Sequence, residues 1–221
     1  EWGFTLELVK QAHVHYQMAD NAKACFIFAH GAGADMSHTF MEKVSALLLS
    51  ENISVLRFNF PYMEKRKEDG KRRPPDRMPK LLESYREIIT RLDLLVPVFI
   101  GGKSMGSRVA ATIANEFQEK IDGVICLGYP FHPQKKPENL RLDPLQDTKC
   151  PVLIIQGERD ALGNKEEIEN YDIDKNCRVE YLMDGDHDFK PRVKSGTTHQ
   201  NNILEAVKFM DEFIDEYKSE Q

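Results

Sequence analysis

The sequence has little of what marks secreted, membrane or nucleic-acid-binding proteins. It contains four cysteines in 221 residues, and no two of them form a C-x-x-C pair, so neither a disulfide scaffold nor a zinc site is expected. No apolar run approaches the roughly 20 residues of a membrane span. The net charge of −6 offers no basic surface for binding phosphates. We therefore predict a cytoplasmic protein without a nucleic-acid or membrane partner.

The composition is that of an ordinary folded domain. Hydrophobic residues make up 41% and charged residues 30% of the chain, which argues against disorder, collagen and a coiled coil. The length suits one α/β domain of about 200–250 residues, so we predict a single domain over residues 1–221. The first residue is Glu1 rather than Met, which leaves open a processed or trimmed start.

Apolar runs and helical spacings alternate along the chain. Strands are expected at residues 13–18, 24–29, 53–58, 96–100, 121–127, 152–155 and 179–182. Apolar residues at helical spacing follow in residues 40–48, 81–92, 105–117 and 203–217, with Thr39 and Glu42 as a capping box for the first of these helices. This order predicts a mostly parallel sheet with helices on both faces and the less apolar strand 179–182 at its edge.

One stretch is unusually rich in charge. Residues 64–80 carry many Lys and Arg side chains together with Gly and Pro, and this composition predicts a surface loop. Because the stretch follows a strand end, it is expected either to be a solvated loop, to bind an anionic substrate group, or to dock a protein partner.

The sequence Gly102-Lys103-Ser104-Met105-Gly106 stands directly between a buried strand and a helix. A nucleophile elbow requires this setting, because glycines two residues either side of the serine relieve collisions in a tight turn. We therefore predict that Ser104 is a catalytic nucleophile. The alternative is a phosphate-binding turn, but the spacing fits neither of the common glycine-rich phosphate motifs.

A serine nucleophile needs a base and an orienting carboxylate. His187 follows the last expected strand, and Asp160 follows the strand before it, so both are expected at the same sheet edge as Ser104. The order Ser104, Asp160, His187 matches the Ser…Asp…His order of one fold class. Glu158 is the local rival to Asp160. A metal site formed by His187 and its acidic neighbours, or by His13 and His15, is the weaker interpretation, and we predict none.

An oxyanion hole is expected where residues 30–33 follow the buried strand 24–29. The N–H groups of Ala32 and Met105 are the predicted donors, with Gly33 as the alternative to Ala32. Losing one such donor typically costs about 3 kcal/mol in the transition state. Further residues expected near the substrate are His30, Gly33, Arg57 and Lys103.

These residues, in this order, resemble the α/β-hydrolase superfamily over nearly the whole chain. The resemblance is to its small, lid-less branch, which includes dienelactone-hydrolase-like enzymes. Residues 29–36, 57–63, 101–110 and 184–189 are most similar to the group of testis-expressed protein 30 and predicted bacterial hydrolases, which also takes in the hydrolase-like domain of a chromatin-complex scaffold subunit. The dienelactone enzymes are known for a cysteine nucleophile, so Ser104 argues against carrying over their activity.

The resemblance implies a serine hydrolase that cleaves ester or thioester bonds of a small acyl substrate without a cofactor. Residues 129–150, where the family accepts cap insertions, form only a short polar connection with four prolines, so no substantial lid is expected. The alternative function is a catalytically silent scaffold that keeps the fold. The sequence makes no prediction of the oligomeric state.

Overall fold

The computed structural model describes the backbone of residues 2–220 and the side chains of residues 5–220. In this part of the chain, seven strands form one sheet in the order β1-β3-β2-β4-β5-β6-β7. Only β1 (Val14–Gln17) runs antiparallel, against β3 (Ile53–Phe58). The others are parallel: β2 (Ala24–Ala29), β4 (Val98–Lys103), β5 (Gly123–Leu127), β6 (Val152–Gly157) and β7 (Cys177–Leu182). The predicted α/β fold is confirmed.

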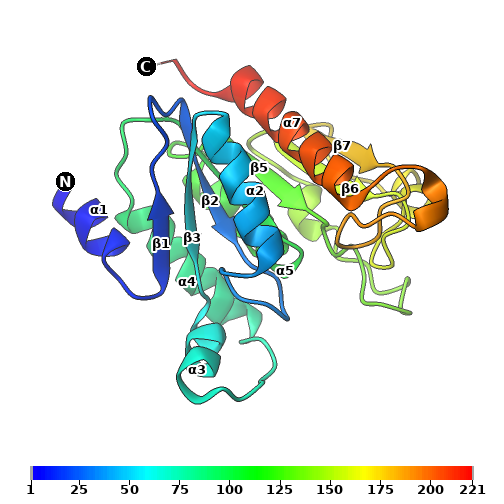
Figure 1. Cartoon of the computed structure of the whole chain (residues 1–221), viewed down its shortest axis with the longest axis horizontal. Coiled ribbons are helices and arrows are strands. Elements are labelled where there is room, and N and C mark those ends of the chain that lie inside the picture. Colours follow the sequence, from blue (N-terminus) through cyan, green and yellow to red (C-terminus); the bar gives the residue numbers. More distant parts are fainter. Residues whose placement is uncertain (1, 221) are drawn as a thin grey trace.

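Helices cover both faces of the sheet, so it has two hydrophobic cores. On one face pack α2 (Thr39–Ser50) and α7 (His199–Tyr217), which lie side by side in front of the sheet in Figure 1. On the other face pack α1 (Trp2–Val9), α4 (Met78–Arg91) and α5 (Met105–Ile113). The central strands β2 and β4 are buried along their whole length, because a parallel sheet is covered on both sides. Strand β7 is only partly buried and lies at the edge, as predicted.

The prediction of a loop over residues 64–80 is wrong for about half of the stretch. Its first part belongs to α3 (Pro61–Asp69), which begins with a proline in its first turn and ends at Gly70 in a left-handed conformation with φ 71°. Proline suits a helix start and glycine a helix end. Only the segment between α3 and α4 is irregular. The almost continuous charge of α3 hides its helical period, and for that reason the sequence pattern missed it.

Three other expectations about helices need correction. Thr39 is the first residue of α2 and not its cap; His38 is the N-cap, and its Nδ1 accepts a hydrogen bond from the N–H of Phe40 at 3.3 Å. The helix expected over residues 105–117 ends at Ile113 and continues as a 3-10 helix over Ala114–Phe117. Helix α1 and the short α6 (Lys165–Ile168) were not predicted.

The connection between β5 and β6 builds no cap. In the described chain it contains one 3-10 turn, Asp143–Leu145, so the carboxyl edge of the sheet lacks the large lid that other proteins insert here. Another short 3-10 turn, Val193–Ser195, lies before α7. None of the described helices combines the length and the apolar character that crossing a membrane would need.

Candidate active site

Ser104 occupies a strained turn between β4 and α5. Its backbone has φ 53° and ψ −117°, a conformation that costs a non-glycine residue about 1–3 kcal/mol and is found mainly at functional sites. The surrounding packing enforces the turn. A Cβ on Gly102 would lie 2.5 Å from the carbonyl carbon of Gly106, and one on Gly106 would lie 2.6 Å from the backbone oxygen of Ala29. Both glycines are therefore required by close approach of the backbone.

The three predicted polar residues meet in a continuous chain of hydrogen bonds. The Oγ of Ser104 lies 2.7 Å from Nε2 of His187, and Nδ1 of His187 lies 2.8 Å from Oδ2 of Asp160. The other carboxylate oxygen of the fully buried Asp160 accepts from the N–H of Leu162 at 2.8 Å. This network fits a neutral His187 that donates from Nδ1 and accepts from Nε2, a tautomer assigned from the hydrogen bonds.

The rival carboxylate Glu158 has a different role. It accepts a hydrogen bond from the N–H of Asp184 at 2.6 Å, whereas Nδ1 of His187 is paired with Asp160. Close packing under the His187 loop depends on Gly157, where a Cβ would lie 2.2 Å from the backbone oxygen of Asp186. Glycine at the end of β6 thus lets the loop approach Asp160.

The loop after β2 presents free backbone N–H groups beside Ser104. Within the described chain, no hydrogen bond is made by the N–H of Ala32, and Met105 is the first residue of α5, where an N–H has no partner in a preceding turn. Side chains behind this loop hold its carbonyl oxygens. The hydroxyl of Tyr62 donates to the carbonyl oxygen of Ala32 at 2.9 Å, and Nη1 of Arg66 donates to the carbonyl oxygen of Gly33 at 3.2 Å. The arrangement suits an oxyanion hole, with Ala32 and Gly33 both lining the cavity.

Two residues expected to contact the substrate lie instead behind this loop. His30 is fully buried; its Nδ1 lies 2.7 Å from the oxygen of Gly31, and its Nε2 accepts from the N–H of Phe60 at 3.0 Å. Burial lowers the pKa of His30 to about 4. Arg57 is also buried and donates to the oxygen of Met36 at 2.6 Å. The expectation of substrate contact is therefore corrected for both: they position the loop.

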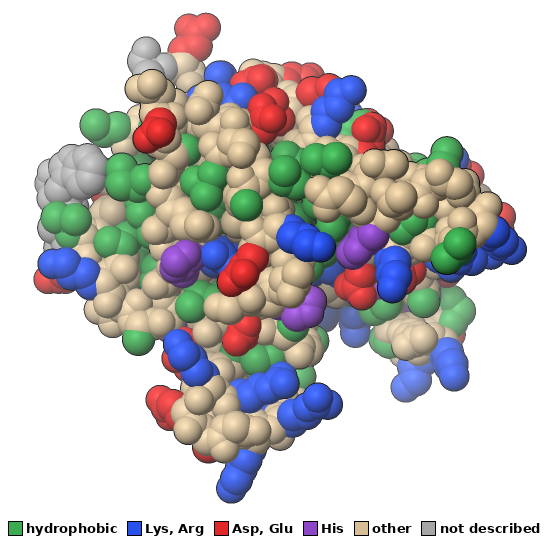
Figure 2. Space-filling model, in the orientation of Figure 1, with side chains coloured by type: hydrophobic (Ala, Val, Ile, Leu, Met, Phe, Trp, Pro, Cys, Tyr) green, Lys and Arg blue, Asp and Glu red, His purple; other side chains and the backbone are tan. Residues whose placement is uncertain are grey.

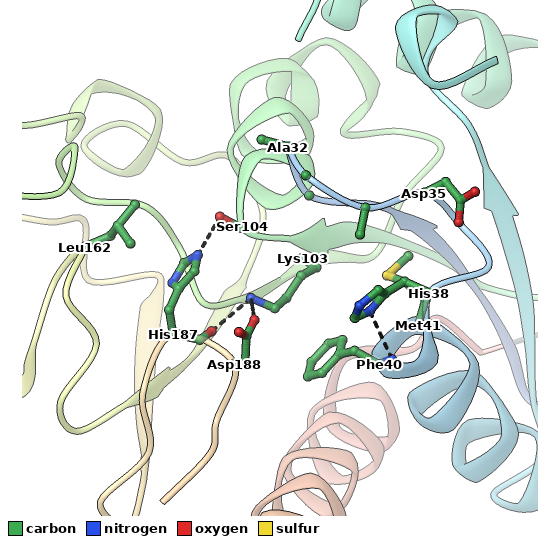
Figure 3. A pocket seen from close by; sticks show the side chains of 13 residues that line it. Ala32, Asp35, His38, Phe40, Met41, Lys103, Ser104, Leu162, His187 and Asp188 are labelled. Atoms are coloured by element: carbon green, nitrogen blue, oxygen red, sulfur yellow. Dashed lines mark hydrogen bonds and ion pairs between the residues drawn. The ribbon is translucent and has the colours of Figure 1, made fainter. Parts of the chain in front are cut away.

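Lys103 does line the cavity, but its ammonium group already has partners within the protein. Its Nζ donates to the oxygen of His187 at 2.9 Å and lies 3.2 Å from Oδ1 of Asp188 (Figure 3). It also sits over the ring of Phe40, 5.4 Å from the centroid. Burial lowers the pKa of Lys103, against the opposing effect of Asp188. The geometry makes Lys103 a clamp on the His187 loop.

Ser104 stands between two cavities. One has a volume of about 410 Å³ and is the cavity of Figure 3, lined by the oxyanion loop and by His38, Phe40, Met41, Lys103, Leu162, His187 and Asp188. The other, of about 310 Å³, is lined by Ala32, Ser104, Met105, Leu162 and by residues that the sequence reasoning did not single out: Pro75, Asp76, Met78, Leu81, Arg108, Pro130 and Arg141. Of these, Arg108 was within reach of sequence reasoning, because it lies one helical turn after Ser104.

The histidines and acidic residues do not gather into a metal centre. In the part of the chain that the structure describes, no three His, Cys, Asp or Glu side chains are placed to share an ion. The acidic neighbours of His187 have protein partners instead: Asp184 pairs with Arg192 at 2.6 Å, and Asp186 accepts from the N–H of Asp188 and of Lys190.

The chain is similar to known proteins in both sequence and fold. The model of a family described as an alpha/beta hydrolase domain matches residues 22–215. Dienelactone hydrolase from Anabaena variabilis is 19% identical, with a TM-score of 0.70 over 93% of this chain and 92% of that one. A serine hydrolase without a lid from Xanthomonas campestris is 15% identical, with a TM-score of 0.68 over 92% and 88%. Est1E from Butyrivibrio proteoclasticus, bound to ferulic acid, is 17% identical, with a TM-score of 0.65 over 91% and 95%.

Proposed function

This chain belongs to the α/β-hydrolase family, in its small lid-less branch, and from that premise we propose that it is a serine hydrolase acting on carboxylic ester or thioester bonds. The observation that carries the proposal is the unbroken hydrogen-bonded chain from Ser104 through His187 to the buried Asp160. Ser104 itself lies on a strained turn and lines two cavities, where its hydroxyl would meet a substrate.

Each residue has a defined part in the proposed reaction. His187 takes the proton of Ser104 as its Oγ attacks the substrate carbonyl carbon, and Asp160 stabilises the imidazolium that forms. The N–H groups of Ala32 and Met105 hold the oxygen that becomes negative. His187 then protonates the leaving oxygen or sulfur, which departs and leaves an acyl group on Ser104. A water molecule, deprotonated by His187, attacks this acyl group, and the acid is released as Ser104 regains its proton.

The surroundings of Ser104 favour a small substrate. Both cavities are open to solvent and of modest volume, about 410 and 310 Å³, and the described connection between β5 and β6 supplies no lid to enclose a long acyl chain. The proposed chemistry requires no metal or organic cofactor.

An activity-based probe tests the proposal. A fluorophosphonate should label the purified protein, and Ser104→Ala should abolish both labelling and hydrolysis of p-nitrophenyl acetate. Ser84→Ala, in a serine of α4 that lies outside both cavities, is the matched control and should behave like the wild type. Equal labelling of the Ser104→Ala protein would refute the assignment. A folded wild-type protein that neither reacts with the probe nor hydrolyses esters or thioesters would favour the silent scaffold.

A further inference from the structure

The cavity of about 310 Å³ on one side of Ser104 contains two arginines, Arg108 and Arg141. They reach it from segments far apart in the sequence. Arg108 lies in the first turn of α5, four residues after Ser104, and both residues line this cavity. Arg141 comes from the connection between β5 and β6. Two arginines from distant segments therefore line a cavity that the candidate nucleophile also lines.

The backbone of Arg141 is fixed while its charged end is left free. Its N–H donates to the oxygen of Phe131 at 2.8 Å, and its carbonyl accepts from the hydroxyl of Tyr129 at 2.7 Å. In the described chain, neither the guanidinium of Arg141 nor that of Arg108 makes an ion pair or a side-chain hydrogen bond. Both side chains are only partly exposed, so water does not fully replace the missing partner.

The two arginines also act on each other unfavourably. Desolvation, and after it the charge of Arg108, lowers the pKa of Arg141. The acidic residue in the same cavity does not relieve this, because Asp76 accepts from the N–H of Tyr62 at 2.9 Å and faces Lys80 at 3.6 Å. A folded chain that holds two like charges together without a counter-charge forgoes stability, which is typical of a site completed by a ligand.

We propose that Arg108 and Arg141 bind an anionic group of the substrate, a carboxylate or a phosphate, beside the bond that Ser104 attacks. This inference rests on the proposed function and specifies its substrate class as anionic esters or thioesters. Two guanidinium groups suit the several oxygens of such an anion. The apolar residues Pro75, Met78, Leu81 and Leu162 line the same cavity and lower the local polarity, which strengthens the attraction.

The cationic surface of α3 does not offer the same site. Its Lys and Arg side chains gather on the projecting end of the molecule in Figure 2, where they are mostly exposed to water. Exposed charges of this kind contribute little to a specific contact. The third cation near Ser104, Lys103, is already held by Asp188. The unpaired charge next to the nucleophile is therefore that of Arg108 and Arg141.

Matched substrates test the proposal. We expect the wild type to hydrolyse the 4-nitrophenyl monoester of glutaric acid with a kcat/KM at least about 10-fold above that of its neutral methyl glutarate counterpart. Arg108→Gln and Arg141→Gln should each reduce kcat/KM for the charged ester about 10- to 100-fold and thereby lower the ratio of the charged to the neutral ester. A 3-phosphonopropanoate ester forms the second arm and distinguishes a preference for phosphate from one for carboxylate.

Two further measurements keep the test decisive. Arg72→Gln, in an exposed arginine outside the cavity, should leave the charged-to-neutral ratio unchanged, and neither cavity variant should melt at a lower temperature than the wild type. Calorimetry with glutarate on the Ser104→Ala protein, with and without Arg141→Gln, measures the anion site without turnover. Hydrolysis with no preference for charge, or with a preference that both cavity variants retain, overturns the proposal while the hydrolase function stands. If no ester is cleaved, glutarate binding that requires Arg141 supports the anion site, and its absence overturns it.

Discussion

The two loops that flank Ser104 are held in place by different physical means. The oxyanion loop after β2 is fixed mainly through its carbonyl oxygens, which lie within hydrogen-bond distance of the neutral His30, the hydroxyl of Tyr62 and the guanidinium of Arg66. The loop of His187 is fixed largely by charged groups. Lys103 contacts both the backbone oxygen of His187 and the carboxylate of Asp188. Asp184 pairs with Arg192, and Asp160 pairs with the imidazole of His187. The first loop has to present backbone N–H groups, and the second has to present a side chain that carries a proton.

The two loops are therefore expected to respond differently to pH and to substitution. The oxyanion loop depends on buried groups such as His30, so it is expected to lose stability when His30 must take up a proton. The His187 loop is held by ion pairs as well as hydrogen bonds, so it keeps its geometry only while those pairs persist. The following changes act on one loop and leave the other in place.

The largest effect is expected from Asp160→Asn. If the amide oxygen keeps accepting from the N–H of Leu162, the NH2 group faces Nδ1 of His187 as a donor. His187 is then held in the wrong tautomer, and kcat should fall about 10⁴-fold. Ester hydrolysis measured beside thermal unfolding checks this, because stability should change far less than activity. Glu158→Gln, at the rival carboxylate, should keep most of the activity; an equal loss in that variant would contradict the assignment of Asp160.

Acid should act on the oxyanion loop through His30. Its folded pKa of about 4 lies below the ordinary value of 6.5, so between these values the unfolded state binds more protons than the folded state. The stabilisation is therefore complete above pH 6.5 and is lost as the pH falls towards 4, by up to about 3 kcal/mol. Urea unfolding at several pH values measures it. His30→Gln should flatten this dependence, and a slope equal to that of the wild type would show that His30 is not its source.

The smallest effect is expected from Lys103→Met. The side chain of the partner Asp188 is 70% exposed, so water can solvate it when Lys103 is replaced by an apolar chain of similar length. The free energy of unfolding should therefore change by only about 1 kcal/mol. Loosening the His187 loop should nevertheless lower kcat about 10-fold, since small displacements of a base are costly. Lys194→Met, at an exposed lysine, provides the baseline. A variant with unchanged kcat and KM would remove Lys103 from the positioning of His187.

The sequence predicted the residues that carry local signals. Ser104 was indicated by its glycines and by the strand before it, and Asp160 and His187 by their places after strands of a parallel sheet. Residues whose role depends on distant partners were not predicted. Arg57 and His30 looked like substrate contacts, but the strand ends turn them towards backbone carbonyls. Tyr62 and Arg141 carry no local signal at all, because their partners are 30 and 12 residues away.

The sequence by itself determined the order of the strands, the elbow at Ser104 and the order of the three polar residues, since each depends on neighbours within a few positions. Only the tertiary structure decided between Asp160 and Glu158, turned Lys103 onto the His187 loop, and brought Arg108 and Arg141 to one cavity without a counter-charge. The physical reason is that burial and pairing are properties of the assembled sheet edge. A charge is satisfied or left free only once the loops from several strands have met there.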